Sequence, residues 1–273
     1  MQDRSQVRRR KGLTLMELVV VLTILVGLAA ILVPLFPNLL RRTHKATDAT
    51  QTAEVAKAVQ LYQGTYSSYP NDWDLMTDGT TTANLSYIPS DGGVPFGGAA
   101  TIGFLTDNEA AALKRVGITT GHAFATTPGH PTLDPYSNLI TAPITITGQG
   151  GATPTAVFII SGATPSNVPQ EIKNIAARDP SARFVVFGVG TRSSMVGRVM
   201  QNAPTSVPQN NNFTPATLYS RVGVIFQVSG VGISTSGGTE RARLICACAL
   251  EDDELESTEK DIVNYYDIAQ TGQ

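Results

Sequence analysis

The sequence predicts an α+β fold, in which one long N-terminal helix packs on an antiparallel sheet that carries inserted loops. Two observations predict it. The first is an apolar run at residues 13–40, which passes into a helical periodicity that continues to residue 64. The second is a set of separate strand-like segments in the rest of the chain, divided by stretches rich in Gly, Thr, Ser and Pro. With 273 residues, the chain is long enough to bury a substantial core.

Basic charge is concentrated at the N-terminus. The chain has 20 Lys and Arg against 22 Asp and Glu, a formal net charge of -2. Residues 1–12 hold five basic residues and one acid, a balance of +4, which leaves -6 for the remainder. An acidic body with no further basic cluster offers little electrostatic attraction to phosphates, so no nucleic-acid partner is expected.

Residues 13–40 predict a transmembrane helix. Glu17 is the only ionisable residue in this run. A helix of that length measures roughly 42 Å at 1.5 Å per residue, more than the ~30 Å hydrocarbon core of a bilayer. The basic N-terminal flank predicts a cytoplasmic N-terminus, although Arg41, Arg42 and Lys45 on the far side weaken the contrast.

Two alternatives for this segment are a secretory signal peptide and an ordinary single-span anchor. A signal peptide has an apolar stretch of about 7–15 residues and a small-residue cleavage site. The run in this chain is longer, and no A-x-A pattern follows it. Against an ordinary anchor stands Glu17, because an unpaired charge in lipid costs at least about 2.5 kcal/mol and therefore calls for a partner or a function.

The stretch KGLTLMELVVVL at residues 11–22 resembles the cleavage and methylation motif of type IV pilins and type II secretion pseudopilins. That motif has a short basic leader ending in glycine, then an apolar helix with glutamate as the fifth residue after the cut. The resemblance implies that a prepilin peptidase cuts between Gly12 and Leu13 and that the new amino group of Leu13 is methylated. The family usually has phenylalanine at the position of Leu13, so this residue is a conservative departure.

The resemblance also implies a division of the chain and a function. Residues 1–12 are a leader; residues 13–64 form the long helix, transmembrane over 13–40 and amphipathic over 41–64; and residues 65–273 form a globular α+β head. The expected function is that of a structural filament subunit of a type IV pilus-like fibre or a type II secretion pseudopilus, not an enzyme. Alternatives are a minor pilin-like tip or adhesive subunit and a membrane-anchored periplasmic enzyme.

The implied partners are other filament subunits of the same or a different chain, the prepilin peptidase, an inner-membrane assembly platform, and membrane lipid before assembly. The implied location is a single pass through the cytoplasmic membrane with a periplasmic or extracellular head, and a cell-surface filament after assembly. No cofactor and no metal are expected.

The position of Glu17 has a physical rationale. After the cut, Glu17 lies four residues from the amine of Leu13, on the same helix face. In a filament of staggered subunits, the carboxylate of one subunit can meet the amine of a neighbour inside an apolar core. Because either charge left unpaired there is costly, such a contact would fix the register between subunits. Before assembly, the same two groups can pair within one chain.

Pro34 and Pro37 predict a bend in a helix that continues beyond them, because proline has no backbone N–H to donate. Many type IV pilins carry a helix-bending proline where Pro34 falls. The alternative is that the helix ends there. Continuation is favoured because the periodicity resumes after the prolines, and Gly64 is the expected stop.

The resumed periodicity predicts one apolar stripe that packs on the sheet. Its residues recur at steps of three and four: Ala46, Ala49, Ala53, Ala56, Val59 and Tyr62. The polar and charged residues of the same segment are expected mostly off the stripe, in solvent: Lys45, Asp48, Gln51, Glu54 and Lys57.

In the head, five strands and three helices are expected. The strands fall at residues 139–147, 157–161, 183–189, 222–228 and 242–249. One short helix begins at a capping box, Thr106 to Glu109, and is closed by Gly117. Further helices are expected at residues 169–178 and 257–269. The stretch at residues 77–104 is predicted to be loop with short strands.

No catalytic motif is recognised. Gly188-Val189-Gly190 lacks the helix mouth, the lysine and the glycine spacing of a phosphate loop, so it is interpreted as a glycine pair where a strand turns. The sequence has no G-x-S-x-G elbow. Cys246 and Cys248 fall on one face of a strand and are interpreted as two small, partly buried hydrophobic residues.

Two groups of residues are weighed as metal ligands. His122, His130 and Asp134 have imidazole and carboxylate donors, but their spacing matches no zinc pattern. An acidic run near the C-terminus is interpreted as a solvated face, with calcium as the alternative because calcium prefers hard oxygen ligands. That run consists of Glu251, Asp252, Asp253, Glu254 and Glu256.

Substituting Gly12 tests the cleavage motif. Intact-mass analysis of the wild type from a peptidase-positive host should show loss of residues 1–12 and one methyl group on Leu13. Gly12 changed to a bulky residue such as Phe should block processing, because the cut follows a residue without a side chain. Normal processing of that variant, or a wild type that keeps Met1, would contradict the motif.

Overall fold

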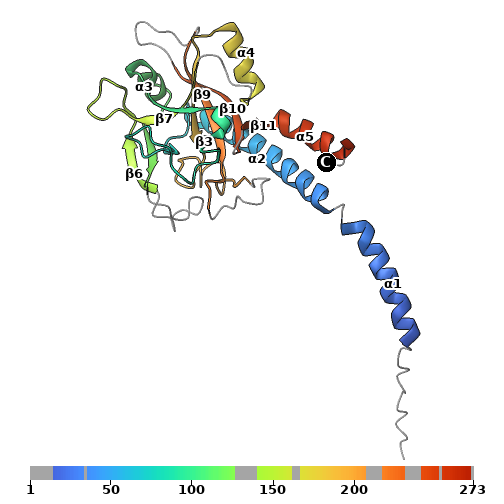
Figure 1. Ribbon diagram of the computed structural model, residues 1–273. Helices are drawn as coiled ribbons and strands as arrows, with labels where there is room; N and C mark the ends of the chain where they lie inside the picture. The colour runs from blue at the N-terminus through green and yellow to red at the C-terminus, as the bar shows by residue number, and fades with distance from the viewer. Residues whose placement is uncertain are drawn as a thin grey trace, which may run out of the picture.

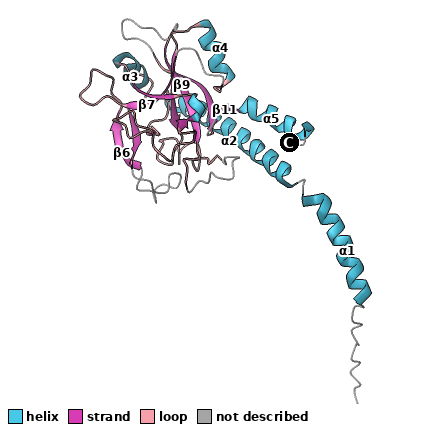
Figure 2. Cartoon of the chain, viewed as in Figure 1, coloured by secondary structure: helices cyan, strands magenta, loops and turns pink. Residues whose placement is uncertain are grey.

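The computed structural model describes residues 15–33, 36–126, 140–161, 167–206, 217–230, 241–251 and 254–271. Within these residues the protein is mixed α and β (Figures 1 and 2). An apolar N-terminal helix leads through a second helix into a head built on a largely antiparallel sheet. The α+β class expected from the sequence is therefore present at this level of description.

Two helices occupy the range where one long helix was expected. α1 is Leu15–Leu32 and α2 is Phe36–Tyr66. In Figure 1, α1 projects away from the head, whereas the far end of α2 runs into it.

Pro34 lies outside the described residues. Pro37 is the second residue of α2, where a helix tolerates proline because the first N–H groups have no partner within the helix. The role of the two prolines in a bend stays a prediction.

The end of α2 lies two residues beyond the expected stop. Gly64 is inside the helix, which ends at Tyr66. The rings of Tyr62 and Tyr66 lie 4.5 Å apart between centroids, one turn from each other, and this contact favours the extra residues of helix. Ser67 then takes a left-handed conformation, with φ of 56°, and the chain leaves the helix there.

Eleven strands are assigned in the described residues, nine of them in one sheet. The sheet runs in the order β11-β10-β9-β8-β1-β5-β6, and β7 joins β8 to β4. All of its pairs are antiparallel except β1 with β5, which is parallel. β2 and β3 form a separate hairpin. The strands are β1 Trp73–Asp74, β2 Ser90–Asp91, β3 Val94–Pro95, β4 Thr101–Phe104, β5 Thr120–Phe124, β6 Ile140–Thr145, β7 Ala156–Ser161, β8 Arg183–Gly188, β9 Val222–Ser229, β10 Arg243–Leu250 and β11 Leu255–Ser257.

The central strand β8 has both faces buried. Its run Arg-Phe-Val-Val-Phe is almost continuously apolar, as is typical of a strand covered on both sides. Phe184 and Val186 point into one hydrophobic cluster, and Val185 and Phe187 point into the other. The alternation of side chains along one strand therefore joins the two cores of the head.

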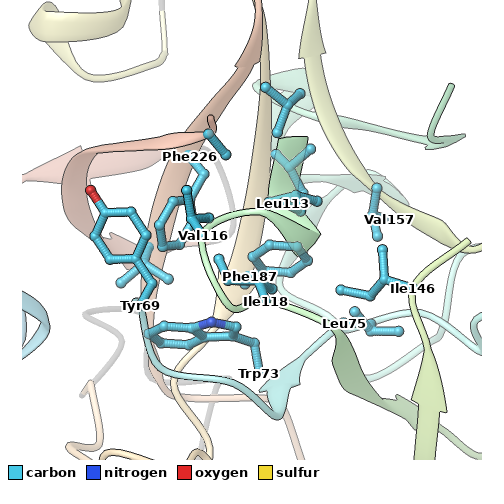
Figure 3. Packing of buried hydrophobic residues seen from close by; sticks show 14 of the residues in the cluster. Tyr69, Trp73, Leu75, Leu113, Val116, Ile118, Ile146, Val157, Phe187 and Phe226 are labelled. Atoms are coloured by element: carbon cyan, nitrogen blue, oxygen red, sulfur yellow. The ribbon is translucent and has the colours of Figure 1, made fainter. Parts of the chain in front are cut away.

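The core that contains Val185 and Phe187 holds α2 on the sheet. Figure 3 shows its aromatic centre, with Phe226 and Phe187 beside Tyr69 and Trp73. The Phe226 ring meets Tyr69 edge-on at 5.1 Å and Trp73 at 5.9 Å between centroids. α2 adds Val55, Val59 and Tyr62 to the same cluster, so the helix is part of the core of the head and not an appendage.

Three shorter helices complete the head. α3, Asp107–Lys114, begins at the expected capping box between Thr106 and Glu109. α4, Gln170–Arg178, buries Ile172. α5, Thr258–Thr271, follows β11 and packs beside α2 (Figure 1). The strand predictions are confirmed in β6 to β10, and the helix predictions in α3, α4 and α5, with shifts of one or two residues at their ends.

A matched pair of glycine substitutions tests the packing of the head. A Cβ on Gly188 would lie 2.1 Å from the hydroxyl of the buried Tyr219, whereas one on Gly64 would meet nothing within 4 Å. Gly188→Ala should lower the free energy of unfolding by about 1–3 kcal/mol. Gly64→Ala, in the exposed face of α2, should raise it by about 0.5–1 kcal/mol. Denaturant titration of the full chain in detergent measures both, and equal effects would contradict the packing described here.

Candidate assembly site

α1 is apolar on every side. It has 18 residues, about 27 Å of helix at 1.5 Å per residue, and it is long and apolar enough to cross a membrane. None of its residues is buried, which distinguishes it from the core helix of a soluble protein. A secretory signal at an N-terminus meets the same length and hydropathy criteria, and the processing experiment above separates the two.

Glu17 is the single acid in the first turn of α1, and its side chain is exposed. A carboxylate at this end of a helix is favoured by the partial positive charge of the unsatisfied N–H groups. Gly12 and Leu13, the expected cleavage and methylation residues, lie outside the described residues. Their relation to Glu17 therefore remains the expectation derived from the spacing of the motif.

The buried stripe of α2 differs from the expected one. Ala49, Val59 and Tyr62 are buried as expected, but Ala46 is exposed. The stripe instead includes two charged residues that were expected in solvent. Its buried members are Lys45, Asp48, Ala49, Thr52, Val55, Ala58, Val59 and Tyr62. Helical periodicity alone predicted that Lys45 and Asp48 lie in solvent. They are buried instead because residues of the head form ion pairs and hydrogen bonds with them.

Lys45, Glu251 and Glu256 form a buried ionic group, named here the Lys45 cluster. The exposed fractions of the three residues are 3%, 8% and 0%. The ammonium of Lys45 donates to Oε1 of Glu251 at 2.9 Å and also to Oε2 of Glu256. Lys45 comes from α2, Glu256 comes from β11, and Glu251 directly follows β10. The cluster thus joins the N-terminal half of α2 to the last hairpin of the head.

The electrostatics of the cluster follow from two carboxylates sharing one ammonium. Burial lowers the pKa of Lys45, but the charges of Glu251 and Glu256 outweigh it and hold the pKa above its usual value. Burial raises the pKa of Glu251 to about 7; Glu256 adds to the rise and Lys45 opposes it. With both acids ionised the cluster carries one excess negative charge, and a proton on Glu251 removes it.

The interpretation of the acidic run as a solvated face is wrong for two of its members. Glu251 and Glu256 are buried against Lys45, while Asp252 and Asp253 lie outside the described residues. Carboxylate oxygens of Glu251, Glu254 and Glu256 lie within 4.8 Å of one another. Lys45 contacts two of these acids, and Lys260 contacts Glu254. Lysine ammonium groups therefore supply the positive charge that calcium would supply in the alternative interpretation.

Further polar contacts hold α2 along its length. The hydroxyl of Ser206 donates to Oδ1 of the buried Asp48 at 3.2 Å. At the far end, Arg198 donates to the hydroxyl of Tyr62 at 3.2 Å, and its guanidinium lies 5.5 Å from the ring centre of Tyr66. These contacts and the apolar stripe fix the rotation of α2 about its own axis.

Among the other candidates from the sequence, the described ones lie in or against the core. His122 is buried in β5, in register with Asp74 of β1; His130 and Asp134 lie outside the described residues. Cys248 is buried and Cys246 packs against the same cluster, as expected for small hydrophobic residues. Burial raises the pKa of Cys246 well above its usual value, which disfavours a reactive thiolate.

The glycine pair at Gly188 and Gly190 makes room for a buried hydrogen bond. The hydroxyl of Tyr219 donates to Oδ2 of Asp74 at 2.6 Å. A Cβ on Gly188 would clash with this hydroxyl, and one on Gly190 would clash with the carboxylate. Burial and the charge of Asp74 hold the pKa of Tyr219 well above its usual value, so its hydroxyl stays protonated as the donor. The interpretation as a structural glycine pair thus gains a physical reason.

Sequence reasoning missed the Lys45 cluster. One signal was present: Lys45 falls at steps of four and seven from Ala49 and Thr52, on the same helix face. Lys45 is buried because it meets Glu251 and Glu256, which lie 206 and 211 residues further along the chain. Periodicity in α2 carries no information about them.

Removing one charge from the Lys45 cluster should destabilise the chain strongly. Lys45→Ala leaves two acids buried beside each other, and losing one partner of a buried pair costs about 3–5 kcal/mol of unfolding free energy. Lys57→Ala, an exposed lysine three turns further along α2, should change it by less than about 0.5 kcal/mol. Denaturant titration in detergent compares the two, and similar midpoints would refute the buried pairing.

Comparisons of the chain with protein-family models, with curated proteins and with solved structures gave no match. Function must therefore be inferred from the residues and the geometry of the chain itself.

Proposed function

We propose that this chain is a structural subunit of a type IV pilin-like filament, either a pilus or a secretion pseudopilus. One observation supports the proposal more than any other. α1 is an apolar helix with no buried residue, it carries a single acid in its first turn, and it leads into a helix that is built into the head. A helix with this pattern needs a membrane around it, and later other helices.

The resemblance of residues 11–22 to the prepilin motif supplies the first step. Hydrolysis of the bond between Gly12 and Leu13 adds water across the peptide, leaving a carboxylate on Gly12 and an amine on Leu13. The amine is protonated at neutral pH, so the shortened chain begins with a positive charge four residues from the carboxylate of Glu17. In this proposal the enzyme that makes the cut is a prepilin peptidase, and Leu13 is then methylated.

Assembly is the second step. While the subunit is in the cytoplasmic membrane, lipid covers α1 and the head lies outside. An assembly platform moves the subunit out of the bilayer, and the neighbouring α1 helices replace the lipid. Glu17 then pairs with the amine of Leu13 of the adjacent subunit. Because a displaced subunit would leave both charges unpaired in an apolar surrounding, the pair selects one stagger between subunits.

α2 suits the role of a rigid connection in this proposal. Its far end lies in the core of the head through Val55, Val59 and Tyr62, and its near end is held through Lys45. A head fixed in this way would follow the orientation of its helix in the filament. In this proposal the function of the chain is mechanical.

Glu17→Ala separates assembly from processing. The variant should be cut normally and reach the membrane at wild-type levels, because the motif glycine and the apolar run are intact. Filaments recovered by shearing should fall at least about tenfold, since each Leu13 amine would be buried without a partner, and every 1.4 kcal/mol is a factor of ten.

Glu54→Ala is the matched control, because Glu54 is exposed on α2 and contacts solvent. That variant should form filaments at wild-type levels. Normal filament yield from Glu17→Ala would refute the pairing, and the absence of this chain from wild-type sheared fibres would refute the proposed function.

A further inference from the structure

The contact between α2 and α5 includes an open groove. A groove of about 550 Å³ lies between them, lined in part by Ala49 and Ala53 of α2 and by Ile262 and Tyr265 of α5. Ile262 and its neighbours Val263 and Tyr266 are 47%, 52% and 60% exposed. Apolar burial along this contact is therefore incomplete, and the guanidinium of Arg42 in α2 lies 4.6 Å from the ring centre of Tyr265 in α5.

The last hairpin supplies a second, ionic attachment. The turn between β10 and β11 is closed by a hydrogen bond from the N–H of Glu251 to the carbonyl of Glu254, 3.1 Å long. Glu251 and Glu256 flank this turn and both accept from Lys45 of α2. α5 begins at Thr258, two residues after Glu256, so the position of the first turn of α5 depends on the cluster.

The charged groups near Glu251 belong to α2, to β11 and to the turn between β10 and β11. Lys45 belongs to α2, Glu256 belongs to β11, and Glu254 lies in the turn. Lys260 of α5 pairs with Glu254 at the exposed edge of the group. In the Lys45 cluster, one ammonium faces the carboxylates of Glu251 and Glu256. With both acids ionised, the cluster therefore holds one more carboxylate than ammonium.

We propose that the Lys45 cluster is a proton-operated latch that holds the C-terminal segment, β11 and α5, on α2. With Glu251 protonated, one carboxylate faces one ammonium and the buried group is neutral. With Glu251 ionised, a second negative charge is confined beside Glu256 out of water, and the hairpin is held less firmly. This proposal rests on the contact of α2 with the head and is independent of the function of α1.

The direction of the pH effect follows from the pKa of Glu251. Because its folded pKa of about 7 lies above the ordinary value of 4.5, its contribution to stability is complete below about pH 4.5 and is lost as the pH rises through 7. Lys45 has a raised pKa, so its own contribution is lost only above its ordinary value of 10.5, outside this window. The latch is thus tightest in mild acid and loosest above neutrality.

Hydrogen exchange of the full chain in detergent tests the latch. Amide protection of residues 254–271, corrected for the intrinsic rate at each pH, should fall at least about tenfold between pH 5 and pH 8 in the wild type. Peptides of β8 and β9 serve as the internal reference for global opening. Glu251→Gln mimics the protonated acid, so its protection should stay high and change little over the same range.

Two further variants keep the test decisive. Glu256→Gln removes the second carboxylate, so that Glu251 faces Lys45 alone. Protection in this variant should therefore be lost at a lower pH than in the wild type. Glu259 is an exposed acid in α5, and Glu259→Gln makes the same change of charge. This control should show the same dependence of amide protection on pH as the wild type. Identical pH profiles for the wild type and Glu251→Gln, or protection in the wild type that falls on acidification, would overturn the latch.

Discussion

An apolar helix of 18 residues with no buried side chain cannot remain in water, and this constraint governs the whole chain. Each large aliphatic side chain left in solvent forgoes about 1.5–3 kcal/mol of burial. Covering α1 with lipid or with other helices would recover this free energy. The described part of the head does not cover α1, which projects away from it, and the two cores of the head close around β8, α2 and the shorter helices instead.

α2 connects these two environments. Along one face it contributes apolar side chains to the core, and at its near end Lys45 lies between two acids from the last hairpin. Apolar packing tolerates small rotations, whereas a buried ammonium that loses its carboxylates is costly. The ionic contact therefore specifies which face of α2 meets the sheet and where the C-terminal helix begins. Because α5 follows directly from this hairpin, one proton on Glu251 acts on the segment nearest the junction between the head and α1.

Much of the fold was readable from the sequence because local chemistry decided it. The apolar run of β8 is continuous since both of its faces are covered, and the Thr106 capping box marks the start of α3 through contacts three residues apart. β1 has only two residues and β11 lies at the end of an acidic run, so neither carries a strand pattern.

The Lys45 cluster was missed for a related reason: its partners are distant in sequence, and periodicity places a lysine in water unless the fold brings acids to it. The motif at Gly12, Leu13 and Glu17 was identified by its resemblance to the prepilin motif, and it stays a prediction because Gly12 and Leu13 lie outside the described part of the chain.

The most direct test of the account is a high-resolution reconstruction of fibres sheared from cells that express this chain. If Glu17 sets the register, its carboxylate should lie about 3 Å from the N-terminal nitrogen of Leu13 in a neighbouring subunit, with α1 surrounded by other α1 helices. A chain that still carries residues 1–12 in the fibre, or a Glu17 that faces solvent with no amine beside it, would contradict the account.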